Sequence, residues 1–319
     1  MHQALCYPRE VVGGLTLPVD QLDHVVYQGI KPRVVYYCPS TGDALSHASY
    51  KLAINNAVNR VYPGTDHTPF IFTVLLGAVA VRVGYLSLDC STRAENAGSP
   101  LVCRLSNLCT IVTRMQPDVM FFSEACCKST TVVSGTNLYL EVKAEVSWLE
   151  MRALITLQTG LVFCHEAANS FSRSNDSFGV AVFCKPDFLK SVKSAQAYNL
   201  MDCLSGSRQG SGCVVVELTD GTALVGCHFP LDFSTEITEN LTGKAMTSLL
   251  KLLDTYVTAY GFGDMNTIAG TMSEAVELAL RGTKWEMTRG VYTFLAGFYG
   301  STKSTNHFIE LTDEVIANM

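Results

Sequence analysis

The chain has 319 residues, and its 23 Lys and Arg against 29 Asp and Glu give a formal net charge of −6. Apolar residues make up 48% and charged residues 16%, which excludes a disordered polymer, and the acidic balance argues against a protein that coats nucleic acid by charge alone. The 12 cysteines are scattered and form no CxxC pair, so they favour reduced thiols over a disulfide framework or a structural zinc site. We therefore expect a core-rich globular protein inside a cell, either cytoplasmic or organellar, with mitochondria among the organelles considered.

The first 69 residues differ from the rest of the chain because prolines separate them into short segments. Short β-branched or aromatic runs at 24–27 and 34–38 lie between prolines, namely Pro8, Pro18, Pro32, Pro39 and Pro63. We predict a β-containing N-terminal extension over residues 1–69 and one main domain over residues 70–319.

The main domain begins with an apolar run from Phe70 to Val81. Gly77 interrupts this run and Arg82 ends it, so it is shorter than the roughly 20 residues of a membrane span and predicts two buried strands. Helical spacing of apolar residues follows over 101–115 and stops before Pro117. Further strands are predicted at 118–122, 138–142, 161–165, 180–184, 214–218 and 223–227, and further helices at 245–257 and 271–282. This order of strands and helices predicts an α/β or α+β sandwich.

Polar residues directly follow several of these strands, where sites collect in layered folds. Glu124 follows one buried run, His228 follows another, and Asp264 and Asn266 lie in Gly263-Asp-Met-Asn266. Carboxylates from separate strands can converge on a hard divalent cation, and a nearby histidine can stabilise charge on a phosphoryl group. Taken singly, each residue is more often a solvated turn residue, an Asx-turn or a hydrogen-bonded sheet-edge histidine.

The order of four segments resembles the endonuclease/exonuclease/phosphatase superfamily. The segments are Pro117-Asp-Val-Met-Phe-Phe-Ser-Glu124, Phe178-Gly-Val-Ala-Val-Phe183, Leu224-Val-Gly-Cys-His228 and Gly263-Asp-Met-Asn266. The second of them, continued to Phe188, is most similar to the nocturnin-like deadenylase branch. The resemblance covers about residues 79–310 and implies an α+β fold, a four-layered αββα sandwich, that hydrolyses phosphoesters with Mg²⁺ or Mn²⁺.

The resemblance also implies roles for individual residues. Glu124 would bind the metal ion, Asp264 would orient or activate the attacking water, and His228 would stabilise charge on the phosphate. Asn266 would hold a non-bridging phosphate oxygen. Lys244 lies where many relatives place a basic substrate-binding residue, although a solvated helix-face lysine is an equally good interpretation.

Three departures from the family pattern concern the same site. Where relatives have an aromatic residue followed by Asn, this chain has Tyr85-Leu86, unless Asp89 supplies a metal-binding carboxylate instead. Ser123 replaces the Gln that usually precedes the metal-binding Glu. Residues 306–309 align with a strand that carries a catalytic Asp in relatives, but Asn306 stands in its place, and no Asp-His pair follows before Met319.

Two functions from different classes follow. The first is a Mg²⁺-dependent phosphodiesterase acting on RNA or nucleotides, such as a 3′-exonuclease of deadenylase type. The second is a catalytically degenerate protein that serves as a structural or assembly partner and docks through its N-terminal extension. The middle segment is locally basic by two charges, which fits either a nucleic-acid entrance or a solvated loop; the residues concerned are Lys185, Lys190, Lys193 and Arg208 against Asp187 and Asp202.

Overall fold

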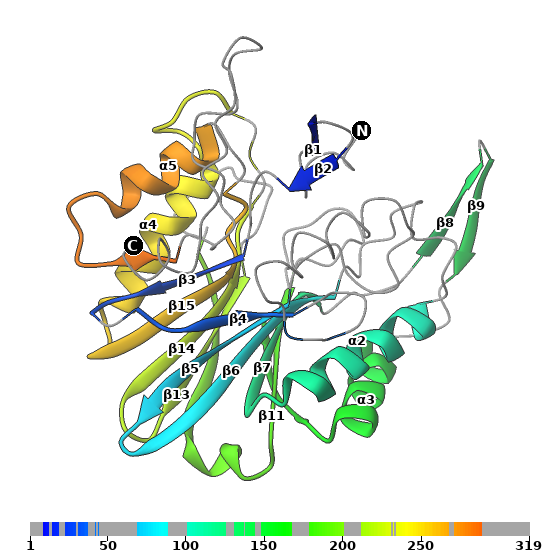
Figure 1. Ribbon diagram of the computed structural model, residues 1–319, viewed down its shortest axis with the longest axis horizontal. Helices are drawn as coiled ribbons and strands as arrows, with labels where there is room; N and C mark the ends of the chain where they lie inside the picture. Colours follow the sequence, from blue (N-terminus) through cyan, green and yellow to red (C-terminus); the bar gives the residue numbers. More distant parts are fainter. Residues whose placement is uncertain are drawn as a thin grey trace.

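The computed structural model describes residues 9–12, 15–18, 23–29, 31–37, 42, 44, 69–88, 101–125, 131–136, 138–143, 148–167, 179–200, 212–230, 232, 234–267 and 271–288. Two sheets of six strands form the centre of the molecule (Figure 1). In spatial order, the first contains β10 (Val162–Ala167), β11 (Gly179–Cys184), β7 (Val119–Ala125), β6 (Val79–Ser87), β5 (Phe70–Leu76) and β4 (Val34–Tyr36). The second contains β12 (Val192–Asn199), β13 (Gly212–Leu218), β14 (Thr222–His228), β15 (Thr258–Asp264), β3 (Asp23–Tyr27) and β16 (Glu286–Met287).

Helices cover the outer side of each sheet. Figure 1 shows α2 (Leu101–Met115) and α3 (Trp148–Thr159) against the first sheet, and α4 (Leu241–Leu253) and α5 (Thr271–Leu280) against the second. The short helix η2 (Phe188–Ser191) joins β11 to β12, while β1 (Arg9–Val12) pairs with β2 (Leu15–Pro18) and β8 (Thr131–Thr136) with β9 (Leu138–Lys143) in separate ribbons.

Three apolar clusters hold these layers together. Buried side chains of α2, including Leu105 and Ile111, pack with Phe122 on the outer face of the first sheet. Phe72, Phe121 and their neighbours fill the space between the two sheets, and α4 packs on the outer face of the second sheet through residues such as Leu249. The molecule is therefore an α+β protein with four layers in the order αββα, as the sequence predicts.

Each sheet contains one parallel pair of strands with a helix between them in the chain. β6, α2 and β7 form one such unit, and β14, α4 and β15 form the other. The strands of a parallel pair run in one direction, so β14 and β15 end side by side at His228 and Asp264. In the first sheet, Ser87 and Ser123 are paired near the ends of β6 and β7. These two strand ends carry most of the polar residues that the sequence singles out.

Most predicted elements are present, with one correction near the site. The apolar stripe predicts a helix over 245–257, but α4 ends at Leu253, where the Asp254 N–H closes the last turn on the Leu250 and Leu252 carbonyls. The chain then forms β15 over 258–264, because Gly261 lets the strand pack directly against Leu249 and Leu253. The segment between this helix and Asp264, for which the sequence predicted no strand, is thus a central strand of the second sheet.

Two strands from the first 69 residues lie in the main sheets. β3 pairs with β15 and β16 in the second sheet, and β4 pairs with β5 at the edge of the first. The division of the chain at residue 69, and the use of the first segment for docking, stay predictions. Within the described residues, the helices are too short or too polar for any of them to cross a bilayer.

Candidate active site

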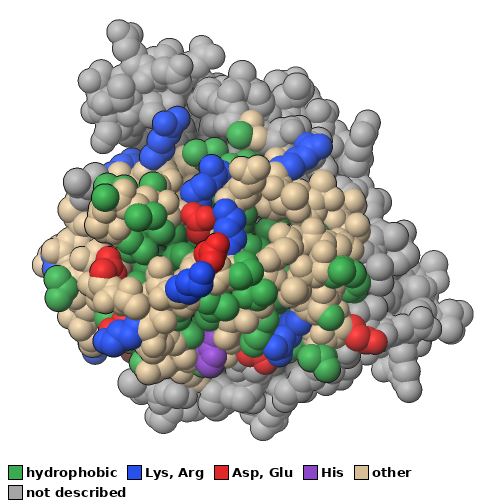
Figure 2. Space-filling view, turned by 90° about the horizontal axis from the view of Figure 1, so that it is seen from below, with side chains coloured by type: hydrophobic (Ala, Val, Ile, Leu, Met, Phe, Trp, Pro, Cys, Tyr) green, Lys and Arg blue, Asp and Glu red, His purple; other side chains and the backbone are tan. Residues whose placement is uncertain are grey.

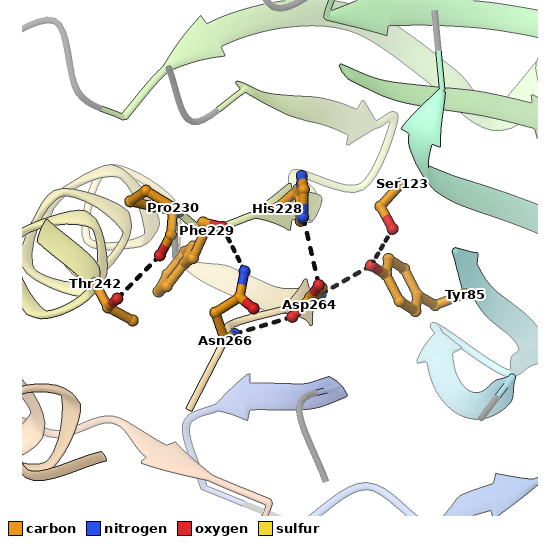
Figure 3. A network of polar contacts seen from close by, with 8 residues as sticks. All are labelled: Tyr85, Ser123, His228, Phe229, Pro230, Thr242, Asp264 and Asn266. Atoms are coloured by element: carbon orange, nitrogen blue, oxygen red, sulfur yellow. Dashed lines mark hydrogen bonds and ion pairs between the residues drawn. The ribbon is translucent and has the colours of Figure 1, made fainter. Parts of the chain in front are cut away.

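His228 and Asp264 form a buried pair at the ends of two neighbouring strands. Their register in the β14–β15 ladder places them directly beside each other, with His228 Nε2 3.4 Å from Asp264 Oδ2 (Figure 3). The two side chains are only 6% and 3% exposed. A carboxylate beside an imidazole in a site of low water content can accept or orient a proton, and the imidazole can stabilise negative charge.

The turn after β15 fixes the orientation of the Asp264 carboxylate. Asp264 Oδ1 accepts a hydrogen bond from the Asn266 backbone N–H at 2.9 Å, while Oδ2 faces His228. Asn266 has a left-handed φ of 46°, and its side-chain amide donates to the Phe229 carbonyl at 2.7 Å. Because asparagine tolerates this conformation, the Asp-x-Asn spacing suits both partners of the turn.

A buried tyrosine links this turn to the other sheet. Tyr85 lies on β6, is fully buried, and accepts a hydrogen bond from the Asp264 backbone N–H at 2.9 Å. Its hydroxyl donates to Ser123 Oγ at 2.5 Å, so β6, β7 and β15 meet at one oxygen (Figure 3). The Ser123 that departs from the family pattern therefore has a defined partner here.

Close approach of β14 and β15 depends on a glycine directly before Asp264. Gly263 has a φ of 141°, and a Cβ at this position would lie 1.9 Å from the Cys227 carbonyl oxygen. Any larger residue would push β15 away from β14. The glycine thus sets the spacing between His228 and Asp264.

Glu124 lies near the end of β7 in an unusual backbone conformation. It has a φ of 47° and is 6% exposed. The register between β11 and β7 shifts here, because the step from Gly179 to Ala181 corresponds to the step from Ala125 to Phe122. Such a bulge re-aims side chains, and it takes Glu124 out of the regular alternation of β7. A carboxylate held at a strand end by a strained bulge is typical of a functional position.

For the remaining predicted site residues, the structure gives less support for a role in the site. Lys244 lies on the first turns of α4, and its Nζ forms an ion pair with the Glu239 carboxylate. Leu86 is fully buried in the cluster beneath α2. Asp89 and the segment 306–309 lie outside the described residues. A substrate-binding role for Lys244 and a metal-binding role for Asp89 stay predictions.

His24, which sequence reasoning missed, lies on β3 opposite Gly263. This histidine is 3% exposed, and its ring nitrogens lie 2.6 Å from the Thr288 carbonyl oxygen and 2.7 Å from Thr267 Oγ1. The run Asp23-His24-Val25-Val26 also carries an Asp-His pair, the pattern for which no match follows Asn306. A search of the whole sequence for that pattern, instead of the C-terminal part alone, would have found it.

The neighbouring cysteine is unsuited to nucleophilic chemistry. Burial raises the pKa of the Cys227 thiol well above its usual value, and the nearby Cys213 and the charge of Asp264 raise it further. Because the thiolate is the reactive form, a thiol of raised pKa is inert at neutral pH. The Cys227 thiol is therefore a poor candidate for a nucleophile beside His228 and Asp264.

The basic middle segment lies at the opposite end of the sheets. Lys185 forms an ion pair with Asp118, which directly precedes β7, whereas Glu124 lies near the end of that strand. Lys193 pairs with Glu217, which is in register with Ala223 at the beginning of β14. Figure 2 shows basic and acidic side chains interleaved on the face seen there, with no field of a single sign. These lysines are neutralised surface residues that lie away from the candidate site.

Within the described part of the chain, no three His, Cys, Asp or Glu side chains lie close enough together to form a metal-binding group. Mg²⁺ needs few protein ligands, because it keeps several waters and is commonly held by one or two carboxylates together with substrate phosphate. Carboxylates at the ends of β7 and β15 are suitable donors for such an ion.

No family model matches the chain, and no curated protein matches it in sequence. Solved structures match it in fold. The human nocturnin catalytic domain with bound sulfate has 13% identity and a TM-score of 0.44, covering 67% of this chain and 73% of its own. An endonuclease/exonuclease/phosphatase family protein from Leptotrichia buccalis has 14% identity and a TM-score of 0.36, covering 55% and 64%.

A humanised D. rerio TDP2 has 12% identity and a TM-score of 0.36, covering 60% of this chain and 65% of its own. The chain spans less than two thirds of the TDP2 and Leptotrichia structures. The similarity is one of fold, and the roles of residues in this chain are argued from its own geometry.

Proposed function

We propose that this protein is a divalent-cation-dependent phosphoester hydrolase that acts on RNA or nucleotides. The observation that carries the proposal is the buried His228–Asp264 pair at the ends of two parallel strands, braced from the other sheet by Tyr85. The order of the four sequence segments supports it, since three of them supply Glu124, His228, Asp264 and Asn266.

Each residue has a role that its surroundings allow. The Asp264 carboxylate orients a water molecule and takes its proton as the water oxygen bonds to phosphorus, while the bond from phosphorus to the leaving ester oxygen breaks and that oxygen takes a proton from solvent. The His228 imidazole stabilises the negative charge that develops on the phosphoryl oxygens, and Asn266 fixes the Asp264 carboxylate through its backbone N–H. Glu124 holds the cation, which when bound supplies Lewis-acid polarisation of the phosphate.

The test is hydrolysis of short oligoadenylate RNA, the corresponding DNA and bis-p-nitrophenyl phosphate with Mg²⁺ or Mn²⁺. We expect Asp264→Asn to lower the rate by about 10²-fold or more, the usual size of a general-base effect. Asp220→Asn is the matched control, because Asp220 precedes β14 at the end opposite His228 and its hydrogen bond from Thr222 N–H needs only a side-chain oxygen.

The result also separates the two functional classes. Equal rates for the wild type and Asp264→Asn, or no hydrolysis of any substrate by the wild type, would remove the proposal and leave the structural or assembly role. Cleavage of RNA but not of DNA would define the substrate class. A rise in melting temperature with Mg²⁺ or Mn²⁺ that Glu124→Ala removes would locate the cation.

A further inference from the structure

His24 stands behind the candidate site, on the N-terminal strand that borders β15. In the β3–β15 register it lies opposite Gly263, the residue before Asp264. Its neighbour Val25 packs between the sheets and Val26 packs under the helices, so His24, which alternates with Val25, shares the helix-side face with Val26. His24 is therefore placed to support the strand end from behind, and the reacting groups lie on the other face.

The hydrogen bonds of His24 fix both its tautomer and the chain around it. A carbonyl oxygen only accepts, so Nδ1 donates to the Thr288 carbonyl at 2.6 Å. In the neutral ring Nε2 then accepts from the Thr267 hydroxyl at 2.7 Å. Thr288 is itself tied to β3, since its Oγ1 accepts from Val25 N–H and its N–H donates to the Val25 carbonyl.

Thr267 directly follows Asn266, so this contact holds the far end of the turn that carries Asp264. The near end is held by Tyr85 through the Asp264 N–H, and the middle by Phe229 through the Asn266 side chain. Asn266 has a left-handed backbone conformation, which asparagine tolerates at a small cost that the surrounding contacts offset. The β3–β15 ladder already pairs Asp264 with Asp23, and the His24–Thr267 hydrogen bond extends this connection to the far end of the turn, beyond the ladder.

We propose that His24 is a positioning residue for the turn Asp264–Asn266. Through the Thr267 hydroxyl it holds the Asp264 carboxylate and the Asn266 amide in their orientation beside His228. The catalytic part of this inference rests on the proposed hydrolase function, whereas the structural part does not. Loss of the contact is expected to affect the chemical step more than substrate binding, because His24 lies behind the turn.

The experiment compares Thr267→Val, which removes only the hydroxyl hydrogen bond, with Thr267→Ser, which retains it. Hydrogen exchange of the backbone amides is followed over residues 262–268 and, as an internal control, over β14. We expect Thr267→Val and His24→Ala to speed exchange in 262–268 by about 10-fold while β14 is unchanged, and Thr267→Ser to resemble the wild type. For hydrolysis with Mg²⁺, we expect Thr267→Val to lower kcat by about 10-fold at nearly constant KM.

The outcomes separate this inference from the proposed function. Unchanged exchange in Thr267→Val would overturn the inference even if the protein is an active hydrolase, and so would a Thr267→Ser variant as impaired as Thr267→Val. If the wild type hydrolyses nothing, the proposed function fails, while the exchange data still decide whether His24 holds the turn. Should His24→Ala not fold, the two Thr267 variants give the answer without it.

Discussion

Gly263 shows how one residue controls the geometry of the site. Its φ of 141° is accessible to glycine alone among common residues, and its neighbour in space is the backbone of β14 rather than a movable side chain. A clash with a backbone carbonyl can be relieved only by separating the strands. The distance between His228 and Asp264 therefore depends on the absence of a side chain.

We predict that Gly263→Ala lowers the free energy of unfolding by more than about 3 kcal/mol, a size reserved for severe packing or backbone conflicts. Gly221→Ala is the control, because Gly221 also has a positive φ, of 86°, but a Cβ at this position would meet no atom within 4 Å. It should cost only about 1 kcal/mol. Urea denaturation of the three proteins measures the difference, and equal losses for both variants would show that φ alone decides.

The sequence was sufficient to find the polar residues at the strand ends, but not the residues that brace them. Asp264 and Asn266 are recognisable because the Asp-x-Asn spacing has a local reason, the hydrogen bond from Asn266 N–H to Asp264 Oδ1. Tyr85 contacts a residue 179 positions away, and no local pattern marks such a pair. The sequence identified Tyr85 only as the possible match to an aromatic residue of relatives, whereas the structure shows that its ring is buried and its hydroxyl joins the two sheets.

At the scale of elements, β3 stands out because both strands with which it pairs in the described part of the chain lie far from it in the sequence. It lies between β15 and β16 and contributes Val25 to the core between the sheets and Val26 to the core under the helices. A strand with neighbours on both edges completes the ladder hydrogen bonds of both. Removing it would leave β15 with an open edge beside the candidate site.

We predict that a chain beginning at residue 31 does not fold, whereas a chain beginning at residue 21 retains the wild-type circular dichroism spectrum and melting behaviour. The shorter deletion removes β1 and β2, which within the described part of the chain pair only with each other, while the longer one also removes β3. Solubility and thermal melting of both proteins provide the measurement. A well-folded chain lacking β3 would contradict the prediction and would favour a detachable extension.

The contact between β3 and β16 should make the free energy of unfolding depend on pH in the alkaline range. Burial raises the pKa of Tyr27 to about 12, and the hydrogen bond from its hydroxyl to the Glu286 carboxylate raises it in the same direction. The unfolded chain has a tyrosine pKa near 10. The stabilisation is therefore complete below about pH 10 and is lost as the pH rises through about 12, because the unfolded state loses its proton first.

The free energy of unfolding of the wild type should accordingly fall by about 2 kcal/mol more than that of Tyr27→Phe between pH 9 and pH 12. Phenylalanine retains the packing but cannot ionise, so the difference between the two proteins isolates this hydroxyl. Urea denaturation at the two pH values measures it. Parallel losses in both proteins would mean that Tyr27 does not titrate differently in the folded state.

The order of elements could be predicted from the sequence better than their ends and their pairing. Alternating or continuous apolar runs identified β6, β7, β11 and β14, since these strands are buried. By contrast, α3 and β12 have weak periodicity and mixed exposure, and neither was predicted. The stripe through Val257 suggested a longer α4, yet Val257 is 97% exposed in the connection to β15.

Chain order also gave a wrong indication of where an Asp-His pair lies near the site. The resemblance implies such a pair only after Asn266, whereas the sheet order brings an N-terminal strand to the edge of β15. Two Asp-His pairs precede the first sheet's long hairpin in the sequence, Asp23-His24 and Asp66-His67. The second of them lies outside the described residues. Spatial neighbours, which decide what a site contains, are not encoded in sequence spacing.

At the scale of the whole molecule, the two sheets share one aromatic core. The rings of Phe121 and Phe262 come from different sheets and meet edge to face, with centroids 4.7 Å apart at 87°. Gly226 lets Phe121 lie against β14, because a Cβ there would be 2.2 Å from the ring. Neither sheet can therefore lose its packing without exposing the other.

We predict that Phe121→Ala lowers the stability by about 3–5 kcal/mol and that both halves respond together. The chain's 2 tryptophans report on opposite outer layers, since Trp148 begins α3 and Trp285 packs in the cluster under α4. Each of the variants Trp148→Phe and Trp285→Phe retains one tryptophan, whose fluorescence follows unfolding of one outer layer in urea. Adding Phe121→Ala should lower the urea concentration at the midpoint of unfolding by the same amount in both.

Leu75→Ala is the control for this comparison, because Leu75 is 69% exposed and its truncation should change stability by less than about 0.5 kcal/mol. A midpoint that shifts for only one tryptophan would show that the two halves unfold separately.

The hydrogen bonds between β3 and Thr288 join residues 263 positions apart, and this has a consequence for biosynthesis. During translation the strands of the first sheet from β5 to β11 emerge together, within residues 70–184. β3 leaves the ribosome before any of them, but its partners β15 and β16 are among the last described elements to be made. The inner aromatic face of the first sheet therefore stays uncovered until the strands of the second sheet have been made, and we expect the nascent chain to expose apolar surface during that interval.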